Sequence, residues 1–206
     1  MKIQHDVLGM FATNCFLVSG GRPGTCILID PADEGKRLIA RIKKEGLAPE
    51  AVLLTHGHYD HFLAVPLLQE TWPDLPVYCH PLDCPEEKEE HDMGIVFPTV
   101  SAFSHVRPLS DGQRLCLAGF DIAVMHTPGH TPGSVTFFIE DAMFTGDFLF
   151  CGSIGRTDFA GGNFSQMKDS LKRLVKVEGE YRVFPGHEKM TTLQREKKEN
   201  PYLKYL

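Results

Sequence analysis

The segment 55–61, with sequence THGHYDH, has the residue types and the spacing of a metal site. Side chains two residues apart in an extended segment point the same way, so His56 and His58 can bind one metal ion. Asp60 and His61 come at the following turn and face elsewhere, which favours a second ion. The glycine between the two histidines leaves out a side chain and lets the backbone bend tightly around the cluster. Imidazole and carboxylate groups of this kind bind zinc, iron or manganese.

Three more residues of the same chemical types stand just beyond apolar strands. They are His130 in HTPGHTPGS, Asp147 in MFTGDFLF and His187 in VFPGH. A single histidine or Gly-Asp pair at such a place is usually a loop residue satisfied by a hydrogen bond, or part of a turn. Several of them at strand ends, together with segment 55–61, are what a site grafted onto a sheet requires. The pattern therefore predicts that seven side chains meet around metal ions.

The elements that must position these residues are short strands mixed with a few helices. Apolar and alternating runs predict strands at 15–18, 25–29, 51–54, 77–79, 113–117, 121–125, 134–139, 142–145 and 181–184. Helical spacing of apolar residues predicts helices over 33–46, 60–72 and 191–200. A further helix is predicted to begin at the cap residue Asn163 and to turn Phe164 and Met167 inward. Strands and helices that mix without strict alternation favour two sheets covered by helices.

The size and charge of the chain restrict its class. With 206 residues it is near the upper limit for one hydrophobic core, so we expect a single domain over residues 1–206. Hydrophobic residues make up 42% and charged residues 23%, as in ordinary folded globular proteins. The formal net charge of −6 has the wrong sign for a protein that binds nucleic acid or anionic lipid. We therefore expect neither partner.

The sequence predicts neither an export signal nor a membrane-spanning helix. The beginning, MKIQHDVLGMFATNCF, contains no apolar core and no small-residue cleavage site. No stretch approaches the roughly 20 apolar residues that a membrane helix needs. The six cysteines form no CxxC pair, and a chain of this size does not need disulfides for stability. We expect a cytoplasmic protein with reduced thiols.

The ligand motifs, in this order, resemble those of the metallo-β-lactamase superfamily, in particular its glyoxalase II-like branch of small bacterial hydrolases. The resemblance extends from about residue 11 to residue 187. It implies an α/β (α+β) fold, a four-layer αββα sandwich with two metal ions at one edge between the sheets. It also implies the ligand sets, which are His56, His58 and His130 for the first ion, Asp60, His61 and His187 for the second, and Asp147 as the bridge.

The resemblance implies hydrolysis through a metal-bound hydroxide, with Asp60 as the catalytic residue that orients the hydroxide or moves its proton. Zinc is the first choice for both ions, and iron or manganese are alternatives. Two divalent ions bring a charge of about +4, and two aspartates with a hydroxide bring about −3, which leaves about +1 in the pocket. An anionic substrate should be attracted, and we expect a small thioester or another thiol-derived compound.

The loop 149–159, with sequence LFCGSIGRTDF, resembles the SIGRTD loop of small glyoxalase II-like hydrolases. Its Arg156 can pair with Asp158 and brace the loop, or it can face the cleft and hold a substrate carboxylate. Ala160 replaces a proline that is frequent in these relatives. Because only 19 residues follow His187, we expect no counterpart of the long C-terminal helical region that contributes to glutathione binding in full-length glyoxalase II.

Two functions from different reaction classes remain open. The first is hydrolysis of a small thioester such as S-lactoylglutathione. The second is a mononuclear iron persulfide dioxygenase acting on glutathione persulfide, because such enzymes share the histidine and aspartate positions and a similar GRTD loop. A β-lactamase is disfavoured because aspartates stand where that branch often has cysteine. An RNA-processing nuclease is disfavoured by the acidic charge, and a flavin-linked di-iron protein by the missing glutamate in HGHYDH.

Several nearby residues keep two interpretations. Asp30, in LIDP, is either a partner of the metal ligands or an aspartate that forms a turn. Thr131 and Ser134 either form hydrogen bonds around His130 or have no such role. The acidic segment 82–104 is either a solvated loop or a lid. The remaining histidines are expected to be surface or core residues, namely His5, His80, His91, His105 and His126.

Overall fold

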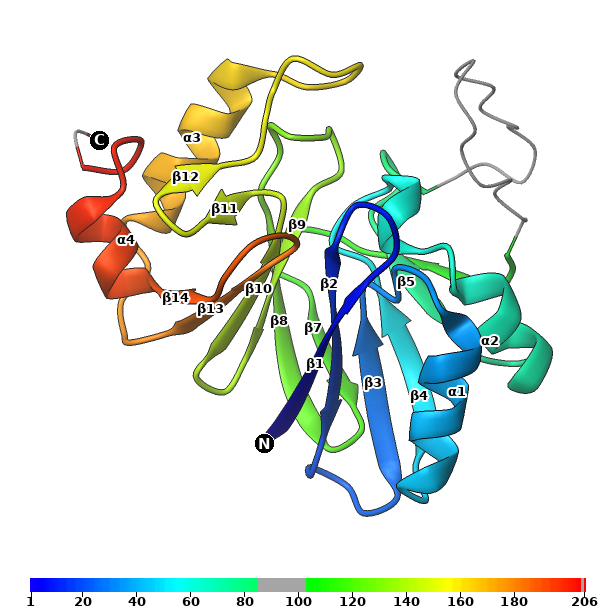
Figure 1. The fold of residues 1–206 in the computed structure, drawn as a ribbon. Coiled ribbons are helices and arrows are strands. Elements are labelled where there is room, and N and C mark those ends of the chain that lie inside the picture. The colour runs from blue at the N-terminus through cyan, green and yellow to red at the C-terminus, as the bar shows by residue number, and fades with distance from the viewer. Residues whose placement is uncertain (85–102, 205) are drawn as a thin grey trace.

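The computed structural model describes residues 1–84, 103–204 and 206, and its strands form two six-stranded sheets and a short hairpin (Figure 1). The first sheet has the order β1 (Lys2–Leu8), β2 (Thr13–Ser19), β3 (Thr25–Ile29), β4 (Ala48–Leu53), β5 (Val77–Cys79) and β6 (Val106–Pro108). The second has the order β14 (Thr191–Thr192), β13 (Arg182–Pro185), β10 (Ala142–Gly146), β9 (Val135–Ile139), β8 (Phe120–His126) and β7 (Arg114–Leu117). The hairpin joins β11 (Leu149–Phe150) and β12 (Ser153–Ile154).

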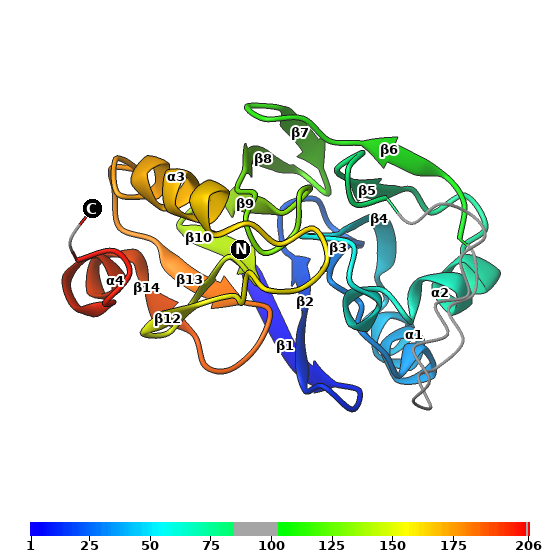
Figure 2. The ribbon, with the colours of Figure 1, turned by 90° about the horizontal axis from the view of Figure 1, so that it is seen from above.

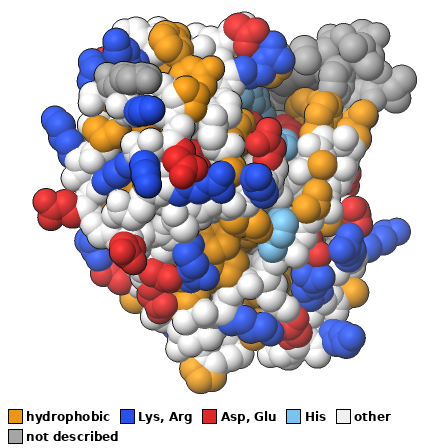
Figure 3. All heavy atoms as spheres, turned by 60° about the vertical axis from the view of Figure 1, so that its left-hand side comes forward, with side chains coloured by type: hydrophobic (Ala, Val, Ile, Leu, Met, Phe, Trp, Pro, Cys, Tyr) orange, Lys and Arg blue, Asp and Glu red, His pale blue; other side chains and the backbone are white. Residues whose placement is uncertain are grey.

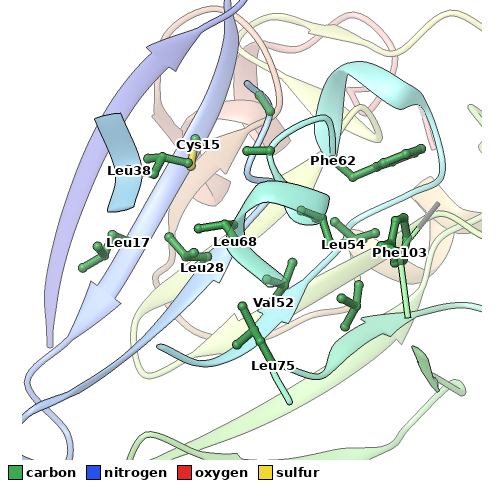
Figure 4. Close-up of a cluster of buried hydrophobic side chains, with 14 of the residues drawn as sticks. Cys15, Leu17, Leu28, Leu38, Val52, Leu54, Phe62, Leu68, Leu75 and Phe103 are labelled. Carbon is green, nitrogen blue, oxygen red and sulfur yellow. The ribbon is translucent and has the colours of Figure 1, made fainter. Parts of the chain in front are cut away.

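Helices cover the outer face of each sheet, which gives the four layers of an αββα sandwich (Figure 2). The helices are α1 (Gly35–Lys44), α2 (Val65–Thr71), α3 (Phe164–Leu174) and α4 (Leu193–Glu199), with a 3-10 turn η1 at Tyr59–His61. Leu38 of α1 and Leu68 of α2 pack on Leu28 and Val52 of the first sheet (Figure 4). On the other side, α3 and α4 pack on Met143 and its neighbours in the second sheet. The predicted fold class is confirmed.

The core between the sheets explains why their strands are apolar on both faces. Along β3, Leu28 points to the helices, while Ile27 and Ile29 point to the opposite sheet, because successive side chains of a strand alternate. The ring centroid of Phe16 lies 5.3 Å from that of Phe144 and 5.5 Å from that of Phe184 in β13. Aromatic pairs of this geometry contribute about 0.5–1.5 kcal/mol beyond their buried area. They join the two sheets beneath the edge where the polar residues meet.

Most predicted elements lie where the pattern indicated, with informative exceptions. The helix predicted over 60–72 is divided into η1 and α2, because Phe62 leaves the helical region and Pro66 suits the first turn of a new helix. The side chain of Asn163 caps α3 as predicted, by accepting a hydrogen bond from Gln166 N at 3.0 Å. Phe164, predicted to face inward, is instead 55% exposed, because it occupies the first helical position beyond the reach of the core.

Strands β1, β6 and β14 and the hairpin β11–β12 were not predicted as such. β1 pairs with β2 at the edge of its sheet and alternates weakly, with only Asp6 and Leu8 buried. The proposed lid or loop over 82–104 falls mainly on residues outside the described ranges. Within those ranges, the structure contains no helix that is both long and apolar enough to cross a membrane.

Candidate metal centre

All seven predicted ligands meet at one edge of the sandwich, where strands from both sheets end. Segment 55–61 follows β4 of the first sheet, and the other ligands follow strands of the second sheet: His130 after β8, Asp147 after β10 and His187 after β13. Figure 3 shows histidine and acidic side chains together in a recess near the top of the molecule. The two sheets therefore contribute complementary parts of one cluster, as the pattern predicted.

The first group is formed by the three histidines His56, His58 and His130. Nδ1 of His58 lies 3.1 Å from Nε2 of His56 and 2.9 Å from Nε2 of His130. Nδ1 of His130 lies 2.7 Å from the carbonyl oxygen of Arg156, so it carries the proton and leaves Nε2 with a free lone pair. Imidazole lone pairs that converge in this way are arranged for a cation.

The second group joins Asp60, His61 and His187. Oδ2 of Asp60 lies 3.7 Å from Nε2 of His61 and 3.5 Å from Nε2 of His187. Thr13 donates a hydrogen bond to the same oxygen at 2.9 Å and so orients the carboxylate. Nδ1 of His61 donates to Asp30, which directs Nε2 toward the cluster.

Asp147 lies between the two groups and faces both. Its Oδ2 is 3.4 Å from Nε2 of His130 in the first group and 3.5 Å from Nε2 of His187 in the second. Its Oδ1 is 3.6 Å from Nε2 of His61. The carboxylate of Asp147 therefore lies near histidines of both groups.

Two atoms of the cluster test whether a metal fits these residues. Nε2 of His61 and Oδ1 of Asp147 are buried, and neither has a hydrogen-bond partner. Their separation of 3.6 Å is too long for a hydrogen bond between them. Buried polar atoms without partners are costly and rare in native proteins. A divalent cation coordinated by both atoms would satisfy them, so the donor set fits a metal.

The pKa values of the histidines differ between the two groups. Burial, followed by the neighbouring imidazoles, lowers the pKa of His58 to about 4, and the pKa of His56 is lowered in the same way. Burial also opposes the charged form of His61, but the carboxylates of Asp30 and Asp60 outweigh it and raise its pKa to about 9. In the metal-free protein, His56 and His58 are thus neutral at neutral pH, and His61 holds a proton where a cation would bind.

Asp30 is a partner of the ligands rather than a turn residue alone. Its buried carboxylate accepts hydrogen bonds from the backbone N–H of Thr55 at 2.8 Å and from the Thr55 hydroxyl at 2.7 Å, and it lies 2.9 Å from Nδ1 of His61. It therefore joins both ends of segment 55–61. Of the two interpretations of Thr131 and Ser134, the hydrogen-bonded one holds, because their hydroxyls lie 2.6 Å apart in the loop that bears His130.

Arg156 adopts the bracing arrangement. Its Nε and Nη2 each donate to Asp158 at 2.7 Å, and its guanidinium carbon lies 3.7 Å from the ring centroid of Phe159. That ring in turn makes an edge contact with His58 at 6.0 Å between centroids. The guanidinium is 55% exposed, and its role toward a substrate stays a prediction.

One residue of the site was missed by the sequence interpretation. Asp83 was included in a segment regarded as solvated charge or a lid, yet its carboxylate contacts both histidine-bearing loops. The available signal was its position four residues after β5, at the same sheet edge as segment 55–61. The other described histidines, His5, His80, His105 and His126, lie outside the metal-binding groups.

The protein has the αββα fold of a metallo-hydrolase, together with a cluster of histidines and aspartates that fits divalent metal ions. The chain belongs to the metallo-β-lactamase superfamily, whose family model matches residues 8–187. It is 35% identical to the probable metallo-hydrolase YqgX of Bacillus subtilis, over 98% of each chain. It is 34% identical to the hydroxyacylglutathione hydrolase GloC of Haemophilus influenzae, again over 98% of each chain.

Solved structures agree with this assignment. The B3 metallo-β-lactamase BLEG-1 superposes with a TM-score of 0.86 at 32% identity, over 98% of this chain and 99% of that one. TTHA1623, solved in a di-iron-bound form, gives a TM-score of 0.84 at 42% identity, over 97% of this chain and 100% of that chain. ETHE1 from Myxococcus xanthus gives a TM-score of 0.79 at 27% identity, over 98% of this chain and 84% of that chain.

Proposed function

We propose that this protein is a binuclear metal-dependent hydrolase that cleaves small thioesters of the S-lactoylglutathione type to a carboxylic acid and a thiol. The observation that carries the proposal is the position of Asp147. Its two carboxylate oxygens face histidines of two separate ligand groups. A carboxylate shared in this way favours two ions over one.

The seven clustered side chains would hold the metals in the sets implied by the sequence. When bound, divalent ions at these residues would lower the pKa of a coordinated water toward neutrality and would polarise the substrate carbonyl. Zinc is our first choice, with iron or manganese as alternatives. The di-iron form of the relative TTHA1623 keeps iron in consideration.

The ionised Asp60 is the catalytic residue of this proposal. Although burial disfavours the charged form, the neighbouring His61 and the hydrogen bond from His187 hold the pKa of Asp60 below its usual range. Its carboxylate is therefore ionised at neutral pH and available as a hydrogen-bond acceptor. It can orient a water molecule at the substrate carbonyl and accept the proton that this water loses. Thr13, whose hydroxyl donates to Asp60 Oδ2, keeps the carboxylate in place.

The identity of the substrate is supported by charge and by a relative. The net charge of about +1 in the loaded pocket favours an anion. GloC, whose name states hydroxyacylglutathione hydrolysis, matches this chain over 98% of its own length. A relative of nearly the same extent thus has that named activity, and this supports a glutathione thioester. Arg156 is the side chain that we propose to bind a substrate carboxylate.

The second candidate is a mononuclear iron persulfide dioxygenase acting on glutathione persulfide. It is favoured by the buried group His56, His61 and Asp147, which supplies two histidines and one carboxylate. This donor set is the one that non-haem iron oxygenases use. The two candidates differ in the number of metal ions and in the need for oxygen.

The decisive experiment loads the protein separately with zinc, manganese and ferrous iron and measures metal content per chain. Each form is then assayed for hydrolysis of S-lactoylglutathione and for oxygen uptake with glutathione persulfide. We expect two ions per chain and hydrolysis without oxygen uptake. One iron per chain together with oxygen consumption would replace the proposal by the second candidate.

A single variant sharpens this test. His187→Gln removes a ligand of the second group only, whereas the first group keeps its three histidines. The hydrolase requires both ions, so its activity should fall by more than the roughly 10–100-fold that loss of an indirect metal partner costs. The exposed His105 provides the matched control, His105→Gln, which should keep full activity. Full activity of His187→Gln with one ion bound would contradict the binuclear mechanism.

A further inference from the structure

We propose that Asp83 is a positioning residue that clamps together the two loops bearing the first group of ligands. Asp83 lies just beyond β5, between the loop with His56 and His58 and the loop with His130. The inference rests on the metal-binding part of the proposed function and not on the choice of substrate.

The carboxylate of Asp83 accepts hydrogen bonds from both loops. Oδ2 accepts from the backbone N–H of Gly57 at 3.1 Å and from the hydroxyl of Thr131. Oδ1 accepts from the backbone N–H of Gly133 at 2.6 Å. Gly57 separates the ligands of one loop, and Thr131 directly follows the ligand of the other. One carboxylate thus connects two loops that are far apart in the chain. Their ligands His58 and His130 are separated by 72 positions.

The two glycines show that both loops are built closely around Asp83. A Cβ atom on Gly57 would lie 2.1 Å from the backbone oxygen of Asp83, and one on Gly133 would lie 2.6 Å from its side chain. Neither glycine has a positive φ, so backbone conformation does not require them. The glycine of HGH is therefore explained by this close approach rather than by a tight bend.

This clamp should set the distance between ligands from different loops. Nδ1 of His58 and Nε2 of His130 are 2.9 Å apart, and no other described carboxylate hydrogen-bonds to both loops. Hydrogen bonds to an ionised acceptor are about twice as strong as neutral ones. Substitution of a residue that orients metal ligands without binding the metal typically lowers metal affinity by about 10–100-fold. Asp83 is in none of the ligand groups of the described chain, so it acts through the ligands.

The test compares Asp83→Asn and Gly133→Ala with the control Asp74→Asn, which makes the same chemical change at an exposed carboxylate. The side chain of asparagine has an NH₂ group in place of one carboxylate oxygen, so Asp83→Asn cannot accept all of these hydrogen bonds. In Gly133→Ala, the added methyl group displaces the carboxylate of Asp83. With Co²⁺ bound, release to an excess of chelator should be about 10–100-fold faster in both variants. The control should release Co²⁺ at the wild-type rate.

A spectroscopic measurement separates positioning from general loosening. The ring N–H of His130 donates to the carbonyl of Arg156, and that of His61 donates to Asp30, so each reports one ligand group in Co²⁺-loaded protein. In Asp83→Asn, the paramagnetically shifted proton of His130 should move while that of His61 stays. Equal changes in both protons, or an unchanged release rate, would overturn the proposal.

A milder variant covers the possibility that Asp83→Asn does not fold. Thr131→Val removes one hydroxyl donor to Asp83 and keeps the side-chain shape. It should accelerate Co²⁺ release and increase amide hydrogen exchange at Gly57 and Gly133, and wild-type values of both would refute the clamp. These measurements use no substrate, so loss of the thioesterase proposal would leave them valid. Conversely, failure of the clamp would leave the thioester assays unaffected.

Discussion

The carboxylate of Asp30 lies 2.9 Å from Nδ1 of His61, and both side chains are buried. This contact fixes the proton of His61 on Nδ1 and leaves Nε2 directed at Asp147 and Asp60. Because the same carboxylate accepts two hydrogen bonds from Thr55, it ties β3 to the segment that follows β4. A residue that contacts no metal thus determines which atom of His61 can bind one.

Asp30→Asn should weaken both metal binding and the fold. An amide cannot accept hydrogen bonds from all three donors, so at least one buried donor loses its partner. We expect a loss of about 1–3 kcal/mol in the free energy of unfolding and a fall of about 10–100-fold in affinity for the second ion. Denaturant unfolding of the metal-free variant and zinc titration measure the two effects, and Asp74→Asn is the control. Unchanged zinc affinity would show that Asp30 does not orient His61.

His58→Ala should abolish turnover without unfolding the chain. The imidazole is only partly buried and contacts His56 and His130, so its loss removes a ligand but little of the core. We expect loss of the first metal ion with a circular dichroism spectrum like that of the wild type. Full activity of this variant would exclude His58 from the metal site.

Metal binding should release protons because of the raised pKa of His61. Its value of about 9 lies above the ordinary 6.5, so protonation stabilises the metal-free fold. This contribution is complete below pH 6.5 and is lost as the pH rises through about 9. A metal that binds at neutral pH displaces the proton, whereas His58, with a pKa of about 4, has none to release.

Calorimetric zinc titrations in two buffers of different ionisation enthalpy measure this release. Proton release should be large at neutral pH, should decline above about pH 9, and should be smaller in His61→Asn. Equal proton release by the wild type and His61→Asn would contradict the assignment.

Arg156→Ala should raise KM for an anionic thioester and change the melting temperature little, since exposed ion pairs contribute little to stability. Asp158→Asn is the matched variant, because it breaks the same pair and keeps the guanidinium. If Arg156 binds substrate, Asp158→Asn should keep KM near the wild-type value. An equal rise of KM in both variants would instead assign Arg156 to bracing the loop.

The sequence alone indicated the features that depend on neighbours along the chain. The spacing of His56 and His58, the cap at Asn163 and the strand at 25–29 follow from local periodicity and backbone geometry. The positions of His130 and the later ligands at strand ends predicted where a site could form. The split between η1 and α2 was missed because helical spacing continues across a break that the local backbone makes at Phe62.

Only the tertiary structure decided which groups meet. The distances of Asp147 from histidines of both ligand groups, the contact of Asp30 with His61 and the contacts of Asp83 with two loops join residues from different strands of two sheets. No periodicity encodes such contacts, because strand order and sheet packing determine them. The need for glycine at position 57 likewise comes from a carbonyl oxygen 26 residues further along the chain, which reaches the site only when β4 and β5 are paired.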